Sequence, residues 1–305
     1  MRLISLILLF LLSGTVSAQK VEWYTTTQTS PWVKQKVKPE RTTTGAEIVL
    51  DPAQRLQLIT GIGGCFNEMG WDALNALSAE DREAVLQAIF GKDGACFDYC
   101  RLPMGANDFA MSFYSSADVA GDFNLVNFNI DRDRYILIPY IKAARQINPD
   151  LRIWASPWCP PPWMKTNNHY ASAVRPSGEK DVNGLLPREA IAEFSTGFRM
   201  EEGYLKTYAD YFARFIKAYE AEGLPLECIH VQNEPCSNQV FPSCKWRTED
   251  LTFFLGHYLG PTFERENIKT DIYFGTINTS NPDYVRTALR DEQAAKYIKG
   301  VGFQW

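Results

Sequence analysis

The chain has 305 residues, 45% hydrophobic and 22% charged, which is an ordinary globular composition and long enough for one large α/β barrel or two smaller domains. Lys and Arg number 31 against 36 Asp and Glu, so the formal net charge is −5. This charge supplies no basic field for a nucleic-acid backbone, and we expect no nucleic-acid partner. Aromatic residues reach 13%, and such rings stack well on the apolar faces of sugars.

Residues 1–18 predict a cleavable secretory signal peptide. Arg2 supplies the positive charge, residues 3–12 are almost all apolar, and the small residues at 16–18 precede the expected cleavage point before Gln19. The apolar run is shorter than the roughly 20 residues of a membrane-spanning helix. We therefore expect a secreted or periplasmic protein without an integral membrane anchor.

The cysteines and histidines do not predict a metal site. Seven cysteines are an odd number for an exported chain, so at least one thiol is expected to be free or paired with another chain. No C-x-x-C pair occurs and only three His exist, so we expect no metal and no cofactor. A disulfide between Cys236 and Cys244 remains an open alternative.

The order of predicted elements indicates two regions after the signal peptide. Residues 19–60 are rich in Thr, Lys, Gln and Val, and the runs 46–51 and 56–59 predict short strands of a side β-domain. From residue 61 to residue 305, strands alternate with helices. The expected strands are 62–66, 97–104, 151–157, 227–233, 271–278 and 301–305. The expected helices start near Ser78 and span 131–148, 203–222, 248–263 and pieces of 283–298.

Six strands with intervening helices suit either a doubly wound sheet or a TIM (β/α)8 barrel. A nucleotide-binding sheet has its Gly-rich turn directly after the first strand and before a helix. Here the run Gly61, Ile62, Gly63 and Gly64 lies before and within that strand instead. The pattern favours an α/β TIM barrel over 61–305, incomplete because about six of its eight strands are present.

Catalytic groups of such a barrel lie at the carboxyl ends of its strands. The residues of this sequence at those positions include a carboxylate, an arginine, aromatic rings and a carboxamide. Together they describe a polar pocket with an aromatic wall, which suits a sugar. The candidates are Glu68, Arg101, Asp108, Trp158, Asn233, Glu234 and Trp305.

Glu234 is the strongest candidate, because it follows a hydrophobic strand. Partial burial there would raise its pKa, as an acid that protonates a glycosidic oxygen requires, and Asn233 could bind a sugar hydroxyl. The alternative is a Glu that only caps the next loop. Arg101, within an apolar strand, needs a partner, which would be either an ionised catalytic carboxylate or a structural ion pair.

The other candidates also have structural alternatives. Asp108 could bind a substrate hydroxyl or form a loop turn, and Trp158 could stack on a sugar or pack the loop before Pro160. Glu68 has the weakest claim, because a Glu after a Gly-rich turn is more typical of a local cap. His230, inside a strand, is predicted to be a buried core residue.

The motifs make the chain similar to glycoside hydrolase family 30, the family of lysosomal glucosylceramidase and microbial β-1,6-glucanases. The matching stretches are 61–64, 101–104 with 108–109, 155–158, 162–167, 233–235, 259–261 and 294–300. The resemblance implies that Glu234 is the general acid/base and Arg101 the partner of the nucleophile. It also implies that the sugar in the first subsite contacts Asp108, Trp158, Asn233 and Trp305.

Two features depart from the family pattern. Gln304 stands before Trp305 where the family usually has His, which affects the expected sugar preference. The family nucleophile is a Glu at the end of the seventh strand, and this sequence ends within the sixth. The sequence is therefore expected to be a fragment of a longer protein.

We predict an exported retaining β-glycosidase that acts on β-glucosidic bonds by double displacement. Its partner would be a carbohydrate or glycoconjugate substrate, with β-1,6-glucan and a glucosylceramide-like or aryl β-glucoside as rivals. The alternative is a non-catalytic carbohydrate-binding fragment that lacks the nucleophile.

Overall fold

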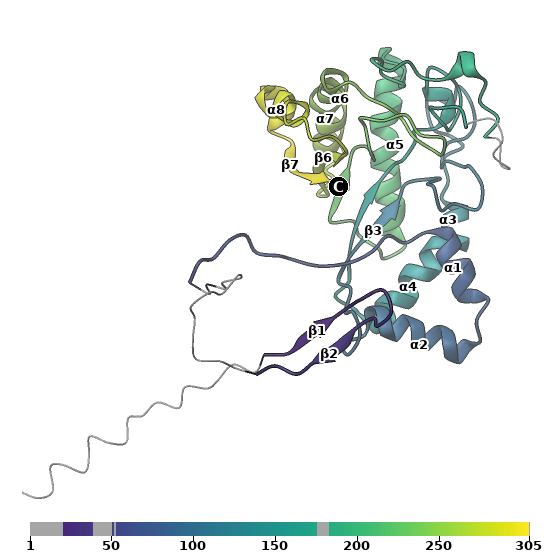
Figure 1. Cartoon of the computed structure of the whole chain (residues 1–305). Coiled ribbons are helices and arrows are strands. Elements are labelled where there is room, and N and C mark those ends of the chain that lie inside the picture. Colours follow the sequence, from purple (N-terminus) through teal and green to yellow (C-terminus); the bar gives the residue numbers. More distant parts are fainter. Residues whose placement is uncertain (1–20, 39–50, 52, 176–182, 305) are drawn as a thin grey trace, which may run out of the picture. The chain divides into compact units, whose positions relative to one another are not determined.

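The computed structural model describes residues 21–38, 51, 53–175 and 183–304 (Figure 1). The chain divides between Leu58 and Ile59 into two compact units. The predicted signal peptide over 1–18, the predicted strand over 46–51 apart from Asp51, and Trp305 lie outside the described residues. Within the described part of the chain, no helix is both long and apolar enough to span a membrane.

The first unit contains a short antiparallel hairpin of β1 (Trp23–Thr25) and β2 (Val33–Gln35). The ring of Tyr24 stacks on Trp32 with 5.3 Å between ring centroids. The prediction of a strand over 56–59 is wrong, because these residues have no strand partner and their apolar side chains are exposed.

The second unit is built on a parallel sheet whose strand order equals the chain order (Figure 1). Its strands are β3 (Tyr99–Pro103), β4 (Arg152–Ser156), β5 (Cys228–His230), β6 (Asp271–Ile277) and β7 (Ile298–Phe303). Helices connect these neighbouring parallel strands, which is the repeat of a (β/α) barrel. The expected incomplete barrel is therefore confirmed, with five regular strands in place of six.

The helices follow the predicted pattern with two internal breaks. Ser78 caps α2 by accepting from the Asp81 amide at 3.0 Å. The helix expected over 131–148 divides at Ile136, and the one expected over 248–263 passes through a π turn. The α-helices are α1 (Glu68–Asn75), α2 (Ala79–Phe90), α3 (Asp131–Tyr135), α4 (Leu137–Ile147), α5 (Glu202–Ala221), α6 (Thr248–Phe254), α7 (Gly260–Arg265), α8 (Asp283–Arg290) and α9 (Glu292–Ala295). The other helical turns are Pro162–Met164, Pro187–Glu189 and Leu255–Leu259.

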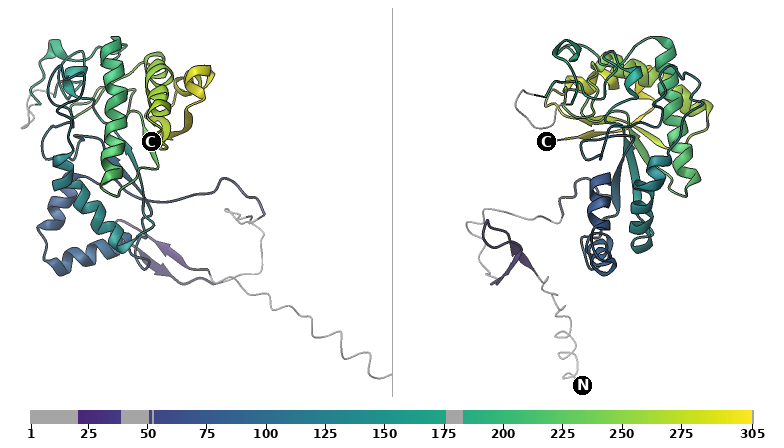
Figure 2. Two further views of the ribbon diagram at one scale, coloured as in Figure 1. Left: turned by 180° about the vertical axis from the view of Figure 1, so that it is seen from behind. Right: turned by 90° about the vertical axis from the view of Figure 1, so that its right-hand side faces the viewer.

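The core lies between the sheet and the helices that Figure 2 shows beside it. Leu102, Ile153 and Ile229 are fully buried on the strands, and Tyr208 and Phe212 of α5 belong to the same cluster. Apolar residues at helical spacing on α5 explain this packing, because they place one continuous face against the sheet.

His230 is buried on β5, as predicted for a core residue. Its Nδ1 lies 3.0 Å from the Gly275 carbonyl oxygen, and its ring lies between Trp154 and Tyr273. Burial lowers the pKa of His230 to about 4, so the ring is neutral near pH 7. Because a carbonyl only accepts, the Nδ1 atom carries the proton.

The segment predicted as the first barrel strand, 62–66, is not a regular strand. It runs parallel to β3 but forms a single bridge, between Cys65 and Arg101. The Arg101 amide donates to Gly64 at 2.8 Å, and the Phe66 amide donates to Arg101 at 2.9 Å. A Cβ at Gly63 would lie 2.1 Å from the Tyr99 carbonyl oxygen, so the glycine run serves a close approach of two backbones.

We predict that Gly63→Ala destabilises the protein by about 1 to 3 kcal/mol, because the Tyr99 backbone cannot move away from the new methyl group. Gly64→Ala is the matched control, since its Cβ would meet only the Phe97 ring, at 3.3 Å. Urea unfolding of the full-length protein measures both. Equal losses in the two variants would contradict the close-approach explanation.

Candidate active site

Successive strands each contribute one polar residue to a row at the carboxyl edge of the sheet. Arg101 lies on β3, Ser156 ends β4, Asn233 follows β5, Thr276 lies near the end of β6 and Gln304 follows β7. Hydrogen bonds join all five into one row. The barrel topology therefore concentrates polar side chains from distant parts of the sequence at one edge.

The side-chain oxygen of Asn233 is the centre of this row. It accepts from Arg101 Nη2 at 2.7 Å, from Gln304 Nε2 at 2.9 Å and from Thr276 Oγ1 at 3.1 Å. The Asn233 amide nitrogen, Nδ2, donates no hydrogen bond to any described residue. This Nδ2 group is a donor available to a ligand hydroxyl.

Arg101 is held by neutral groups and aromatic rings. Its Nε and Nη2 donate to Ser156 Oγ at 3.0 and 2.6 Å, and its guanidinium carbon lies 3.9 Å from the Trp158 ring centroid. Over the described ranges, no carboxylate comes within 4.0 Å of it, so the structural ion pair is not found there. Burial lowers the pKa of Arg101 to about 10, which still leaves it charged at neutral pH.

Glu234 is buried, with 9% of its surface exposed, at the point where the chain leaves β5. Its φ of 49° is left-handed, which is rare and strained for a residue other than Gly, Asn or Asp. The Glu234 amide donates to Thr276 O at 3.1 Å, and its Oε2 accepts from Gln239 Nε2 at 3.1 Å. These contacts fix the carboxyl group at the edge of the sheet.

Burial raises the pKa of Glu234, and the nearby charge of Asp108 adds to the rise. The Gln239 hydrogen bond and the positive charge of Arg101 oppose it. A raised pKa keeps a larger share of the group protonated at a given pH. Glu234 is therefore suited to donate a proton to a ligand oxygen.

Asp108 and Trp158 belong to the same site. Burial raises the pKa of Asp108, whereas the Arg101 guanidinium and the Trp158 side chain lower it. Asp108 remains exposed on the loop after β3, while Trp158 is buried beneath the Arg101 guanidinium. The structure thus brings together five of the seven candidates, whereas Trp305 is outside the described residues and Glu68 pairs elsewhere, with Arg132. The five are Arg101, Asp108, Trp158, Asn233 and Glu234.

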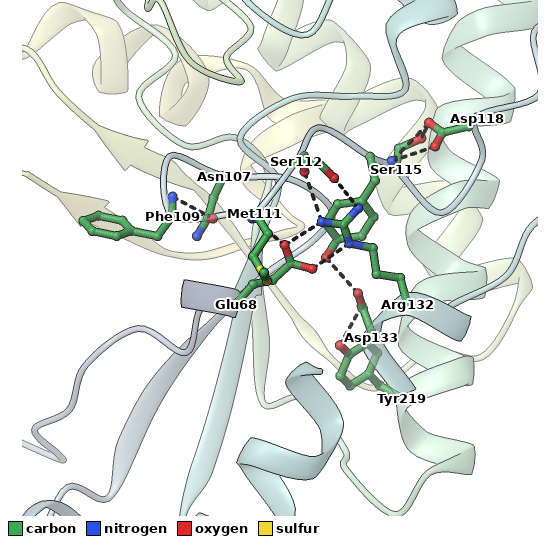
Figure 3. A network of polar contacts seen from close by, with 11 residues as sticks. Glu68, Asn107, Phe109, Met111, Ser112, Ser115, Asp118, Arg132, Asp133 and Tyr219 are labelled. Carbon is green, nitrogen blue, oxygen red and sulfur yellow. Dashed lines mark hydrogen bonds and ion pairs between the residues drawn. The ribbon is translucent and has the colours of Figure 1, made fainter. Parts of the chain in front are cut away.

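Glu68 does not act as the local cap that the sequence suggested. The cap of α1 is Asn67, whose Oδ1 accepts from the Gly70 amide at 2.7 Å. Glu68, the first helical residue, instead forms an ion pair with Arg132 (Figure 3). The reason is local, because an Asn side chain at the cap position already satisfies the free helix amide.

Sequence reasoning missed Ser156, Thr276 and Gln239, which hold the site together. Ser156 and Thr276 end barrel strands, and that position was a usable signal. Gln239 lies in an irregular loop, so no periodicity or spacing pointed to it.

The described residues contain no group of three or more His, Cys, Asp or Glu that could hold a metal ion. All seven cysteines are free thiols, so the disulfide left open between Cys236 and Cys244 is not formed.

Comparison with known proteins gives a family match over nearly the whole second unit. Residues 59–184 and 190–305 match the model of the glycosyl hydrolase family 30 TIM-barrel domain. The chain is 27% identical over 278 residues to lysosomal acid glucosylceramidase of Mus musculus, covering 88% of this chain and 50% of that protein. It is 27% identical over 256 residues to an endo-1,6-β-D-glucanase of Neurospora crassa, covering 83% of this chain and 48% of that protein. The chain therefore spans about half the length of these curated relatives.

Solved structures give the same result. SrfJ from Salmonella typhimurium superposes with a TM-score of 0.73 at 27% identity, covering 90% of this chain and 57% of that one. A solved endo-β1,6-glucanase gives a TM-score of 0.68 at 25% identity, covering 84% of this chain and 54% of that one.

We predict that Gln239→Leu raises the pKa of Glu234 further, because the carboxylate loses a hydrogen bond that favours its charged form. Titration of the Glu234 carboxyl carbon by NMR measures the change. Gln304→Leu is the matched control, since Gln304 contacts Asn233 and not Glu234. A Glu234 pKa that falls or stays fixed in Gln239→Leu would contradict this reading of the contact.

Proposed function

The chain belongs to glycosyl hydrolase family 30, and on this premise we propose that it carries the acid/base side of a retaining β-glycosidase acting on β-glucosidic bonds. The observation that supports this most is Glu234, a buried carboxyl group with a raised pKa beside groups that can bind a sugar. The relatives named as glucosylceramidase and β-1,6-glucanase support the substrate class.

Glu234 acts first as an acid and then as a base. Its proton passes to the glycosidic oxygen as the bond from that oxygen to the anomeric carbon breaks. The resulting carboxylate then takes a proton from the water that releases the sugar. Gln239 occupies Oε2, and Oε1 accepts no hydrogen bond from the described residues, so Oε1 is the atom free to face the leaving oxygen.

The first sugar is held by groups around this carboxyl. Asn233 Nδ2 donates to a hydroxyl, Asp108 accepts from one, and the small part of Trp158 that is not buried, 6% of its surface, packs on the ring. Trp305 adds a further ring contact in this proposal. Gln304, at the position where the family usually has His, donates to the Asn233 side chain and fixes its orientation.

A retaining reaction also needs a second carboxylate about 5 Å from the acid. The resemblance assigns that role to a Glu at the end of the family's seventh barrel strand, so the double displacement is proposed for a protein that carries this strand. Arg101 would hold this carboxylate ionised, because its guanidinium is charged and has only neutral acceptors among the described residues.

The loop after β3 favours an apolar aglycone over a glucan chain. It exposes three large apolar side chains close to Asp108, namely Phe109 at 54%, Met111 at 54% and Phe113 at 41%. An exposed apolar group of this kind is typical of a binding surface, and a hydrocarbon or aryl aglycone would cover all three side chains. A glucosylceramide-like or aryl β-glucoside is therefore the proposed substrate, and export by the predicted signal peptide is proposed with it.

We predict that Glu234→Gln lowers turnover about 10²- to 10⁴-fold on β-glucosides with poor leaving groups, and far less on activated aryl glycosides. Only a poor leaving group needs the proton. The measurement is kcat for both substrate types in the full-length protein. Glu222→Gln is the control, because Glu222 pairs with Arg134 and Lys142 outside the site.

An equal loss on both substrates would contradict the acid role of Glu234. Sugar binding without hydrolysis of any β-glucoside by the full-length protein would favour the alternative, a non-catalytic carbohydrate-binding protein. Faster hydrolysis of β-1,6-glucan than of glucosylceramide would reverse the proposed aglycone preference.

We predict that Arg101→Lys moves the acidic limb of the pH dependence of kcat/KM to higher pH. Lys keeps the charge but lacks the planar guanidinium that donates through Nε and Nη2 and lies on Trp158, so the nucleophile would lose a fixed two-point partner and its pKa would rise. Because the nucleophile must be ionised, activity would then appear only at higher pH. If Arg101→Lys lowers the melting temperature but leaves the acidic limb of the kcat/KM profile at its original pH, this role is refuted.

A further inference from the structure

Glu68 is a buried charge that the proposed reaction does not use. It is 2% exposed, and its two oxygens accept from Arg132 Nε and Nη2 at 2.6 Å each (Figure 3). Such a pair costs desolvation energy, so packed apolar residues could replace it at little loss of stability. The pair therefore calls for an explanation other than net stability.

The pair contacts the loop that carries Asp108. The Ala106 amide donates to the Tyr114 carbonyl at 2.9 Å and closes this loop, residues 106–114. At its tip, the Met111 amide donates to Glu68 Oε2 at 2.7 Å. Arg132 donates to Ser112 Oγ at 2.8 Å and to its carbonyl at 3.2 Å. Both members of the pair thus hold the tip of the loop from below.

The far end of the loop is fixed by the neighbouring carboxylate. Tyr114 lies beneath the Arg132 guanidinium, 4.0 Å from ring centroid to carbon, and donates to Asp133 at 2.8 Å. Asp133 also accepts from Tyr219 of α5 at 2.7 Å. The loop is therefore connected to α1, α3 and α5 through one polar network.

Apolar packing contributes little to the position of the tip, where the one aromatic contact among the described residues is that of Phe113 with Tyr170, 5.3 Å between ring centroids. Phe109, Met111 and Phe113 are exposed, and residues 106–114 form no helix or strand. Apart from the bond from the Met69 amide to the Phe109 carbonyl at 3.2 Å, the tip is anchored to the helices by Glu68 and Arg132. Charge-assisted bonds with fixed geometry set position more strictly than an apolar contact does.

We propose that Glu68 and Arg132 are positioning residues that hold loop 106–114, and with it Asp108, in place beside Glu234. The part of this inference that concerns the sugar contact of Asp108 rests on the proposed function. The anchoring of the loop does not, and it can be tested separately.

The first test is amide hydrogen exchange of the full-length protein. In Glu68→Gln we expect the Met111 amide to exchange about 10- to 100-fold faster, because its charged acceptor becomes a neutral amide oxygen and the ion pair with Arg132 is lost. Arg134→Met is the matched control, since Arg134 is also on α3 and also pairs with a carboxylate, but touches no residue of the loop. Unchanged exchange in Glu68→Gln would overturn the anchoring.

Arg132→Lys is a second variant for the case in which Glu68→Gln does not fold. It keeps the charge opposite Glu68 but removes the two-point contact, so faster exchange of the loop is again expected. Exchange equal to that of the parent protein would overturn the proposal here too.

The second test is a double-mutant cycle on kcat/KM for a β-glucoside. Glu68→Gln should lower kcat/KM about tenfold when Asp108 is present and less than about twofold in the Asp108→Asn background. Equal loss in both backgrounds would show that Glu68 acts on stability alone. Faster loop exchange without any β-glucosidase activity of the parent protein would overturn the proposed function and leave the anchoring intact.

Discussion

The site depends on one neutral acceptor, the side-chain oxygen of Asn233. Donors from β3, from β6 and from the end of β7 all bind this one oxygen, so it holds the polar side chains of the row in fixed positions relative to one another. An Asp in this position would form an ion pair with Arg101 and compensate its charge. An amide does not, so the charge of the guanidinium stays uncompensated, as its proposed role beside a catalytic carboxylate requires. The positive charge also polarises the amide, which makes Nδ2 a better donor toward a hydroxyl.

The backbone around Asn233 makes this convergence possible. β5 is short, and the pairing of β6 with β7 shifts register twice before Thr276, the second time across Gly275, whose φ is 122°. The second shift lies between Tyr273 and Thr276, and such an irregularity bends a strand and redirects the following side chain, here Thr276 toward Asn233. The Gly275 carbonyl also accepts from His230, so the neutral histidine in the core supports the same bend.

Much of this architecture could be predicted, because strands alternating with amphipathic helices leave a strong pattern. The five regular strands and Glu234 followed from it. The segment 62–66 did not, since the contact of Gly63 with the Tyr99 carbonyl depends on how closely two backbones approach. Gln239 also escaped prediction, because a contact made within an irregular loop has no period. The signal peptide and the contact of Trp305 stay predictions.

Two Asn–Glu pairs show how local chemistry separates the proposed anchor from the proposed acid. Asn67 and Glu68 are followed by Met69, so a helix begins and Glu68 turns toward Arg132. Glu234 is followed by Pro235, which has no amide hydrogen and disfavours the right-handed helical conformation in the residue before it. Glu234 takes the left-handed conformation instead, and its carboxyl group stays at the sheet edge with a neutral donor as its hydrogen-bond partner. The residue that follows each Asn–Glu dipeptide thus decides whether the carboxyl group turns into an ion pair or stays at the sheet edge.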